Sequence, residues 1–342
     1  MKILFMGTPD FAASILSSLL KAGHEIIGVV TQPDKQKGRG KAMSFPPVKE
    51  LALQNNLTIY QPVKVREADF VQTVREMAPE AIIVAAFGQI LPKSFLDIPP
   101  LGCINVHASL LPKYRGAAPI QYAIIDGDME TGVTIMYMDV QIDTGDMILQ
   151  AKTPITPEET GGSLHDKLAL LGADLLIEAL KKIEAGTANR VAQDDSKATY
   201  VKMLDKNMGN IDFTVSAEQI ERLIRGLNPW PSAYTFLDQK TLKLWKAVAE
   251  DYNYNSENSD ASDNSNVSDN SNAGDNNNVS DIINSNAKPG KIIEIRKDAI
   301  VVMTGRGALA IKELQLEGKN RMTADAFLRG YPIKVGTILG VR

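Results

Sequence analysis

The stretch that decides the fold reads GCINVHASLLPKYRGAAP, from residue 102 to residue 119. Its apolar start predicts a buried strand over 102–106, and proline and glycine break the loop that follows. Side chains along a strand alternate between two faces, so Asn105 and His107 are expected on the same face. A second strand-like run further along the chain leads to Asp143. An amide donor, an imidazole and a carboxylate are the groups needed for transfer at a carbonyl carbon.

Strand and helix patterns alternate on either side of this stretch. The expected strands lie at 2–6, 25–31, 57–60, 81–86 and 134–138, and the expected helices at 9–21, from 46 or 47 onwards, 69–77 and 162–185. Apolar strands that alternate with helices indicate an α/β fold with a parallel sheet covered on both faces. Thr8, ahead of Pro9 at the first helical position, is expected to cap the first helix.

The pattern changes to short strands beyond about residue 204. The expected strands lie at 209–213, 233–237, 243–248, 290–295, 299–303 and 307–316, with one helix at 217–227. Several short strands with one helix predict a small OB-like β-barrel. We therefore expect domains at 1–190 and 209–342, joined by a linker at 191–208.

A segment rich in Asn, Ser and Asp interrupts the second domain at 251–287. It contains six Asp, one Glu and no Lys or Arg, so its charge is −7. Such a composition cannot bury enough apolar surface to offset chain entropy, and we expect a disordered loop between two strands. The following segment, 288–342, has eleven basic and five acidic residues. This excess suits a polyanionic partner such as nucleic acid, although it is also common on solvated surfaces.

The composition of the whole chain indicates a cytoplasmic protein. The 342 residues are 44% hydrophobic and carry a net charge of −4. The single cysteine, Cys103, lies in an apolar run, which rules out a disulfide framework and indicates a reducing compartment. The apolar runs are too short for a signal peptide or a membrane span, and we expect a monomer.

Other kinds of catalytic site have little support. The turn at 7–12 lacks the second glycine of a dinucleotide-binding loop. His24 falls in a helix-to-strand turn, where an exposed side chain is expected, and His165 in an amphipathic helix, where a structural role is expected. Of the three histidines, His107 alone follows a buried strand. The sequence has neither metal-ligand spacing around it nor the Gly-x-Ser-x-Gly elbow of a serine hydrolase.

Several motifs together resemble the folate-dependent formyltransferases. The motifs are SLLPKYRGAAPIQ at 109–121, with Asn105 and His107 ahead of it, GTPDFA at 7–12, TQPD at 31–34, GRGK at 38–41, DTGD at 143–146 and NPWP at 228–231. The resemblance covers nearly the whole chain except 251–287. It implies a Rossmann-like parallel-sheet formyltransferase domain followed by a small OB-like, tRNA-binding β-barrel domain. It also implies transfer of a formyl group from 10-formyltetrahydrofolate to the α-amino group of methionine on initiator tRNA, for translation initiation.

The resemblance assigns roles to the three residues that suggest the chemistry. Asn105 would donate a hydrogen bond to the formyl oxygen, on which negative charge builds during attack. His107 would stabilise that charge as imidazolium or move a proton between the amine and the leaving nitrogen. Asp143 would orient His107 and raise its pKa, with Asp139 and Asp146 as nearby alternatives.

The resemblance also assigns binding residues and requires no metal. The folate cosubstrate is expected beside Ser109, Leu110, Leu111 and Pro112, and its pterin against Phe87, Gly88, Gln89, Ile90 and Leu91. The tRNA acceptor end is expected at a basic loop carrying Lys35, Lys37, Arg39 and Lys41. Weaker candidates for the tRNA body are Lys206, Arg296, Lys297, Arg306, Lys312, Lys319 and Arg321.

Three alternative functions remain open from the sequence. The same formyl-folate site could serve another amine, such as an amino group on a nucleotide sugar, or water, as in a formyltetrahydrofolate hydrolase. A tRNA-binding protein with a decayed site is the third. The basic loop and the barrel argue against a hydrolase, and intact Asn105, His107 and Asp143 argue against decay.

Overall fold

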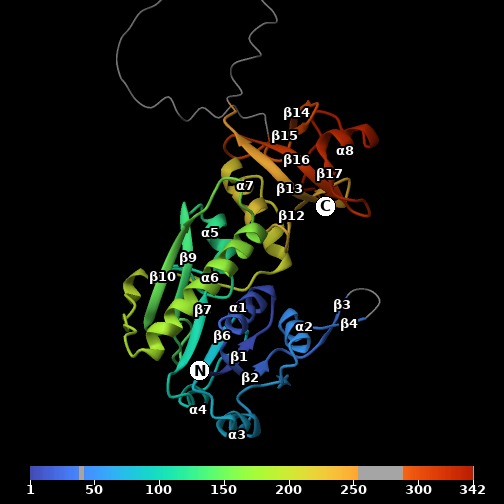
Figure 1. Ribbon diagram of the computed structural model, residues 1–342. Coiled ribbons are helices and arrows are strands. Elements are labelled where there is room, and N and C mark those ends of the chain that lie inside the picture. Colours follow the sequence, from blue (N-terminus) through green and yellow to red (C-terminus); the bar gives the residue numbers. More distant parts are fainter. Residues whose placement is uncertain (38–41, 253–287, 342) are drawn as a thin grey trace, which may run out of the picture. The chain divides into compact units, whose positions relative to one another are not determined.

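The chain forms two compact units, Met1–Asp205 and Lys206–Arg342, each described here by itself (Figure 1). The structure is a computed structural model that describes residues 1–37, 42–252 and 288–341. Residues 253–287, which are nearly all of the Asn-rich segment at 251–287, lie outside the described residues, so the disorder predicted for this segment stays a prediction. The finer domain division with a linker at 191–208 also remains a proposal.

The first unit is built on a seven-stranded sheet with the order β10-β9-β7-β6-β1-β2-β5. The strands are β1 (Lys2–Gly7), β2 (Glu25–Val30), β5 (Ile59–Tyr60), β6 (Ala81–Ala85), β7 (Cys103–His107), β9 (Glu130–Tyr137) and β10 (Met147–Pro154). The strands β1, β2, β5, β6 and β7 are parallel to one another, as the alternation of strands and helices predicts. β9 runs antiparallel to β7, and β10 antiparallel to β9. The sequence analysis missed β10, because this edge strand is half-exposed and mixes polar with apolar residues.

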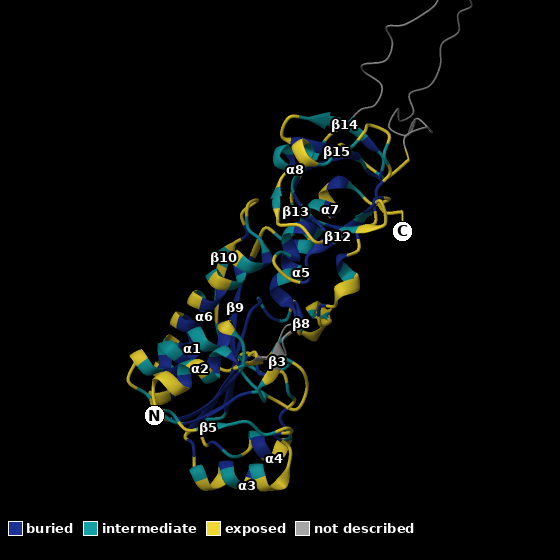
Figure 2. Cartoon of the chain, turned by 90° about the vertical axis from the view of Figure 1, so that its right-hand side faces the viewer, coloured by how far each residue is buried: buried dark blue, intermediate teal, exposed yellow. Residues whose placement is uncertain are grey.

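Helices cover both faces of this sheet, and each face has its own apolar core (Figures 1 and 2). One face carries α1 (Asp10–Lys21), α2 (Pro47–Gln54), α5 (Pro119–Ile125) and α6 (Gly161–Glu184), and the other carries α3 (Ala68–Met77) and α4 (Lys93–Leu96). Along β7, Ile104 and Val106 face the first core and Cys103 faces the second. Alternation therefore places Asn105 and His107 on the same side as Cys103. Burial raises the pKa of the Cys103 thiol to about 12, so it behaves as a buried apolar group.

The turn after β1 is shaped by close packing rather than by a helix cap. The helix α1 begins one residue later than predicted, with Pro9 at the N-cap position, so the capping role predicted for Thr8 is wrong. The Thr8 hydroxyl instead accepts a hydrogen bond from the backbone N–H of Gln32, at 3.4 Å. A Cβ on Gly7 would lie 2.5 Å from Cβ of Ala12. Glycine at this position therefore allows the strand and the helix to approach each other.

A short antiparallel ribbon stands at the carboxyl end of β2. It consists of β3 (Lys35–Lys37) and β4 (Ala42–Ser44), in and directly after the stretch that the sequence analysis described as a basic loop. At its base, the Lys49 ammonium lies 2.6 Å from the Asp34 carboxylate, and Gln61 donates to the same carboxylate at 2.8 Å. These hydrogen bonds to Gln61 and Lys49 lower the pKa of Asp34.

The second unit is an antiparallel β domain, which confirms that the chain beyond about residue 204 changes to a fold of short β-strands. Its sheet has the order β12 (Ala233–Leu237), β13 (Lys240–Glu250), β16 (Ala308–Leu316), β15 (Ala299–Met303) and β14 (Ile292–Arg296), with β17 (Met322–Thr323) beside β16. The helices are α7 (Ala217–Gly226) and α8 (Ala324–Gly330). The predicted strand at 209–213 is wrong, because the 3-10 turn Lys206–Gly209 precedes a single bridge between Asn210 and Tyr234. Asp212 then binds the backbone and hydroxyl of Thr214, which forms a turn.

Packing of α6 against the sheet gives a first prediction. Leu176 is fully buried, whereas Leu170 on the same helix is 68% exposed. Leu176→Ala should lower the free energy of unfolding of the first unit by about 2–5 kcal/mol, because a cavity replaces the side chain. Leu170→Ala should change it by less than about 0.5 kcal/mol. Urea unfolding followed by circular dichroism tests this; similar losses in both variants would contradict the packing described.

That experiment contains an internal control. Both tryptophans of the chain, Trp230 and Trp245, lie in the second unit. Tryptophan fluorescence should therefore report unfolding of the second unit, and its midpoint should not move in either variant.

Candidate active site

The candidate site lies where β7 ends, at the carboxyl edge of the parallel strands. Open α/β sheets bind their ligands at this edge. Asn105 and His107 are 9% and 6% exposed, so their polar side chains are held within the protein. In register, Asn105 pairs with Val84 of β6 and with Met136 of β9. β7, which carries both polar residues, is therefore a central strand of the sheet and not an edge strand.

Asp143 completes the cluster that the sequence predicted. One carboxylate oxygen, Oδ1, accepts a hydrogen bond from Asn105 Nδ2 at 3.5 Å. The other, Oδ2, lies 3.7 Å from His107 Nδ1 and accepts a hydrogen bond from the backbone N–H of Gly116 at 2.8 Å. The structure thus brings Asn105, His107 and Asp143 together, and the Gly116 contact is the shortest of the three.

Hydrogen bonding decides which nitrogen of His107 is available for chemistry. Nε2 lies 2.9 Å from the carbonyl oxygen of Tyr114. A carbonyl oxygen can only accept, so Nε2 carries a proton in both charge states of the ring. Nδ1, on the Asp143 side, is therefore the nitrogen that gains or loses a proton.

The two alternative carboxylates, Asp139 and Asp146, make no hydrogen bond with Asn105 or His107 and take part in the turn around Asp143. Asp139 is exposed, and its Oδ1 accepts hydrogen bonds from the backbone of Gln141 and the hydroxyl of Thr144, which shapes the turn before Asp143. Asp146 is half-buried, and its carbonyl accepts from the N–H of Tyr137. Of the three carboxylates, Asp143 is the one placed against Asn105 and His107.

Neither of the other histidines belongs to this cluster. His24 is half-buried rather than exposed as expected, and burial, together with the nearby terminal amino group, lowers its pKa. His165 hydrogen-bonds Asp166 and packs edge-on against the Phe11 ring, at 5.8 Å between centroids. This contact agrees with the structural role predicted for His165.

The loop after β7 is held by hydrogen bonds to the neighbouring antiparallel strands. Ser109 is fully buried, and its hydroxyl donates to the carbonyl of Lys113 at 2.6 Å. Thr134 on β9 donates to the carbonyl of Ser109, and Gln150 on β10 donates to the carbonyl of Leu111. Leu111 is buried, whereas Leu110 and Pro112 are half-buried. A ligand beside this loop would meet its outer surface, since the serine hydroxyl already has a partner.

The predicted pterin wall, residues 87–91, follows β6 at the same edge of the sheet. Phe87 and Leu91 point into the core under α3 and α4. The Gln89 side chain is bound to the backbone of Val63 and Val65. Gly88 and Ile90 are exposed, the latter by 68%. The surface that this segment offers to a ligand is therefore mainly backbone, together with Ile90.

A strand pair that the sequence analysis did not anticipate braces the site. β8 (Arg115–Gly116) runs parallel to β11 (Tyr200–Val201), just after the 3-10 turn Asp195–Lys197. Arg115 is 1% exposed and hydrogen-bonds Gln193, Asp195 and Tyr200. Sequence reasoning noted Arg115 only as part of the family motif, because an arginine is normally expected at the surface.

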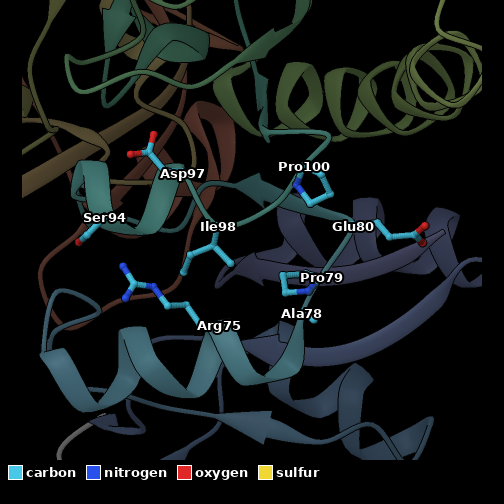
Figure 3. Close-up of a pocket in the computed structure, with 8 residues that line it drawn as sticks. All are labelled: Arg75, Ala78, Pro79, Glu80, Ser94, Asp97, Ile98 and Pro100. Atoms are coloured by element: carbon cyan, nitrogen blue, oxygen red, sulfur yellow. The ribbon is translucent and has the colours of Figure 1, made fainter.

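A surface hollow elsewhere on this unit lies away from the cluster. It is lined by Arg75, Ala78, Pro79, Glu80, Ser94, Asp97, Ile98 and Pro100 (Figure 3). Residues 78–80 precede β6 and residues 98–100 precede β7, so the hollow is at the amino ends of these strands. His107 stands at the opposite, carboxyl end of β7.

The remaining predicted binding residues are only partly described. Lys35 is exposed on β3, whereas the side chain of Lys37 and the whole of Arg39 and Lys41 lie outside the described residues. Within 1–37, 42–252 and 288–341, no group of three or more His, Cys, Asp or Glu side chains is arranged to hold a metal ion. No helix of this described part is long and apolar enough to cross a membrane.

The fold and the site together define an enzyme of the group-transfer class, with an amide, an imidazole and a carboxylate at the edge of a parallel sheet. The chain belongs to the formyl transferase family. Residues 1–180 match the formyl transferase family and residues 203–332 match the formyl transferase C-terminal domain.

Similar proteins cover the full chain. It is 50% identical over 337 residues to the methionyl-tRNA formyltransferase of Agathobacter rectalis, covering 98% of this chain and 99% of the relative. It is 46% identical over 340 residues to that of Clostridioides difficile, covering 99% of this chain and 100% of the relative. The fold is also similar to WlaRD, a sugar 3N-formyl transferase solved in the presence of dTDP and 5-N-formyl-THF. That match has a TM-score of 0.61 and 18% identity, and covers 94% of this chain and 99% of WlaRD.

The brace beside the site gives a second prediction. Gly116 has a φ of +112°, and an added Cβ would lie 2.3 Å from the carbonyl oxygen of Val201. Gly116→Ala should therefore separate β8 from β11 and cost on the order of 3 kcal/mol in unfolding free energy. Gly186→Ala is the control, because Gly186 also has a positive φ, of +66°, but no heavy atom within 4 Å of the new Cβ. The control should cost about 1 kcal/mol; equal losses in urea unfolding would show that the contact with Val201 is unimportant.

Proposed function

We propose that this protein transfers the formyl group of 10-formyltetrahydrofolate to the α-amino group of methionine on initiator methionyl-tRNA. The product is N-formylmethionyl-tRNA for translation initiation. The observation that carries the proposal is the cluster of Asn105, His107 and Asp143 at the carboxyl edge of the sheet. It is supported by full-length relatives named methionyl-tRNA formyltransferase. We further propose that the protein acts in the cytoplasm as a monomer.

Asn105 is suited to stabilise charge on the formyl oxygen. Attack by an amine on the formyl carbon places negative charge on that oxygen. The hydrogen bond from Asn105 Nδ2 to Asp143 is long, at 3.5 Å, so the amide can donate to an incoming oxygen with little loss. One donor of this kind typically contributes about 3 kcal/mol to the transition state.

His107 is suited to move the proton that the reaction exchanges. The new bond joins the methionine nitrogen to the formyl carbon, and the bond from that carbon to folate N10 breaks. The methionine nitrogen loses a proton and N10 gains one, so no net acid or base is consumed. Nδ1 of His107 is the ring nitrogen able to carry this proton, and the Asp143 carboxylate lies 3.7 Å from it.

The residues around the cluster fit a folate cosubstrate. Two segments lie at the same edge of the sheet as His107, because each follows the end of a parallel strand. They are the loop of Ser109, Leu110, Leu111 and Pro112, after β7, and the segment 87–91, after β6. Together they offer backbone groups and the half-buried or exposed apolar side chains of Leu110, Pro112 and Ile90. A flat heterocycle with hydrogen-bonding edges requires this kind of surface. We propose that Phe87 and Leu91 support this surface from the core beneath it.

Basic residues would contact the tRNA at two places. We propose that Lys35, Lys37, Arg39 and Lys41 meet phosphates near the acceptor end. In the second unit, Arg296, Arg306, Lys312 and Arg321 form ion pairs with Glu294, Glu218, Asp298 and Glu313. Because these pairs already neutralise much of their charge, the exposed Lys206, Lys297 and Lys319 are the better candidates for the tRNA body.

The proposed reaction is tested with labelled 10-formyltetrahydrofolate as a third prediction. Label should appear on methionyl initiator tRNA, but not on uncharged tRNA. His107→Ala should lower the rate by about 100-fold or more, since general acid–base catalysis typically contributes 10²–10⁴. Release of formate without any acceptor would instead make the protein a hydrolase. Transfer to a nucleotide-sugar amine in preference to the charged tRNA would identify another acceptor.

The basic loop gives a fourth prediction. Arg39→Ala should raise the KM for charged tRNA at least about tenfold, because one phosphate contact is lost, while the KM for the folate changes little. The slope of log KM for the tRNA against log salt concentration should also fall by about 0.9, the value expected for the loss of one phosphate contact. Equal increases in both KM values would place Arg39 in the folate site or in a structural role.

A further inference from the structure

We infer that Gln193, far along the chain from the recognised motifs, is a positioning residue that holds Asp143 beside His107. The inference rests on the proposed function for its kinetic consequences, but not for its geometry. Gln193 lies in the segment 191–208, which the sequence alone suggests is only a linker.

The loop that carries Asp143 needs support from outside itself. Asp143 has a φ of +55°, in the left-handed region that side chains with a Cβ adopt at a cost. The Gln193 side chain donates through Nε2 to two backbone carbonyls of this loop, those of Asp143 and Gly145, both at 2.8 Å. Both N–H groups of one amide therefore bind the backbone on either side of Thr144.

The orientation of the Gln193 amide is determined by Arg115. Its Oε1 accepts from Arg115 Nε at 3.0 Å and from Nη2 at 2.8 Å. Because a guanidinium only donates, the oxygen of the amide must face Arg115 and its NH₂ must face the two carbonyls. The amide cannot rotate by 180° without losing all four hydrogen bonds.

Arg115 is in turn held in a buried, charged state. Burial favours its neutral form, but hydrogen bonds to Asp195 and Tyr200, at 2.7 and 3.0 Å, raise its pKa overall. The next residue, Gly116, donates its backbone N–H to the Asp143 carboxylate. β8 therefore holds Asp143 at two points, the carboxylate directly through Gly116 and the backbone through Arg115 and Gln193.

The substitution Gln193→Glu tests whether Gln193 positions the Asp143 loop, as distinct from only binding its own segment to Arg115. It keeps an oxygen for Arg115 and adds a counter-charge to that buried cation, so the contact between the two segments is retained. It removes both N–H donors and sets an oxygen against the carbonyls of Asp143 and Gly145. The matched control is Gln54→Glu, at an exposed position at the end of α2.

In kinetic terms, Gln193→Glu should lower kcat by at least about tenfold, since small displacements of catalytic groups cost one to two orders of magnitude. The KM values for folate and tRNA should change less than about threefold and the melting temperature should not fall. Gln54→Glu should match the wild type. An unchanged kcat for Gln193→Glu would overturn the inference.

The pathway through Asp143 is tested by a double-mutant cycle. If Gln193 acts by holding Asp143, then adding Gln193→Glu to Asp143→Asn should lower kcat by less than about threefold. A loss in the double variant as large as the loss in the wild-type background would show that Gln193 acts independently of Asp143, and would overturn the inference.

A crystal structure of Gln193→Glu keeps this inference separate from the proposed reaction. The Asp143 carboxylate should lie farther from His107 Nδ1 than its present 3.7 Å. An unmoved Asp143 would overturn the inference whichever acceptor the enzyme uses. Failure of the wild type to formylate methionyl-tRNA would overturn the proposed function alone.

Discussion

The hydrogen bond from the Gly116 backbone to the Asp143 carboxylate is the contact on which the rest of the site depends. It joins the loop after β7 to the turn between β9 and β10, and it places a negative charge beside Asn105 and His107. Together with the hydrogen bonds from Gln193 to the backbone of this turn, it keeps the carboxylate turned inward and away from solvent. The same loop offers the Tyr114 carbonyl to His107 Nε2, so a single segment determines both the tautomer of the ring and its counter-charge.

The sequence predicted the parts of this site that depend on local rules. Period-two alternation in a buried strand was enough to place Asn105 and His107 on one face, and the strand–helix pattern was enough to predict the sheet. Asp143 was found at the end of a strand-like run, but only the resemblance assigned it a role beside His107, because its position depends on β9 turning back antiparallel to β7. Which of three nearby carboxylates faces the imidazole is a property of that turn, and alternation along a strand does not determine it.

The parts that sequence reasoning missed depend on contacts between distant segments. Gln193 binds backbone carbonyls, so its partners carry no side-chain signal that a motif could reveal. Arg115 is buried because residues 193–200 fold over it, and an arginine is normally expected at the surface. Thr8 was misassigned because its hydroxyl accepts a bond from the distant Gln32 instead of capping its own helix.

In the proposed reaction, the chemistry and the choice of acceptor depend on different parts of the chain. The cluster at the sheet edge would act on a formyl group and an amine, whatever molecule carries that amine. Specificity for a tRNA would then come from the basic loop and from the second unit, where many cations are already paired with carboxylates.

The most direct test is a crystal structure of the protein with a 10-formyl folate analogue that cannot transfer its formyl group. The account predicts that the formyl oxygen lies about 3 Å from Asn105 Nδ2, a normal hydrogen-bond length, with His107 Nδ1 facing the formyl group. The pterin should lie against the 87–91 segment. An analogue bound with its formyl group away from Asn105 and His107, for example in the hollow beside Arg75 and Asp97, would contradict the account.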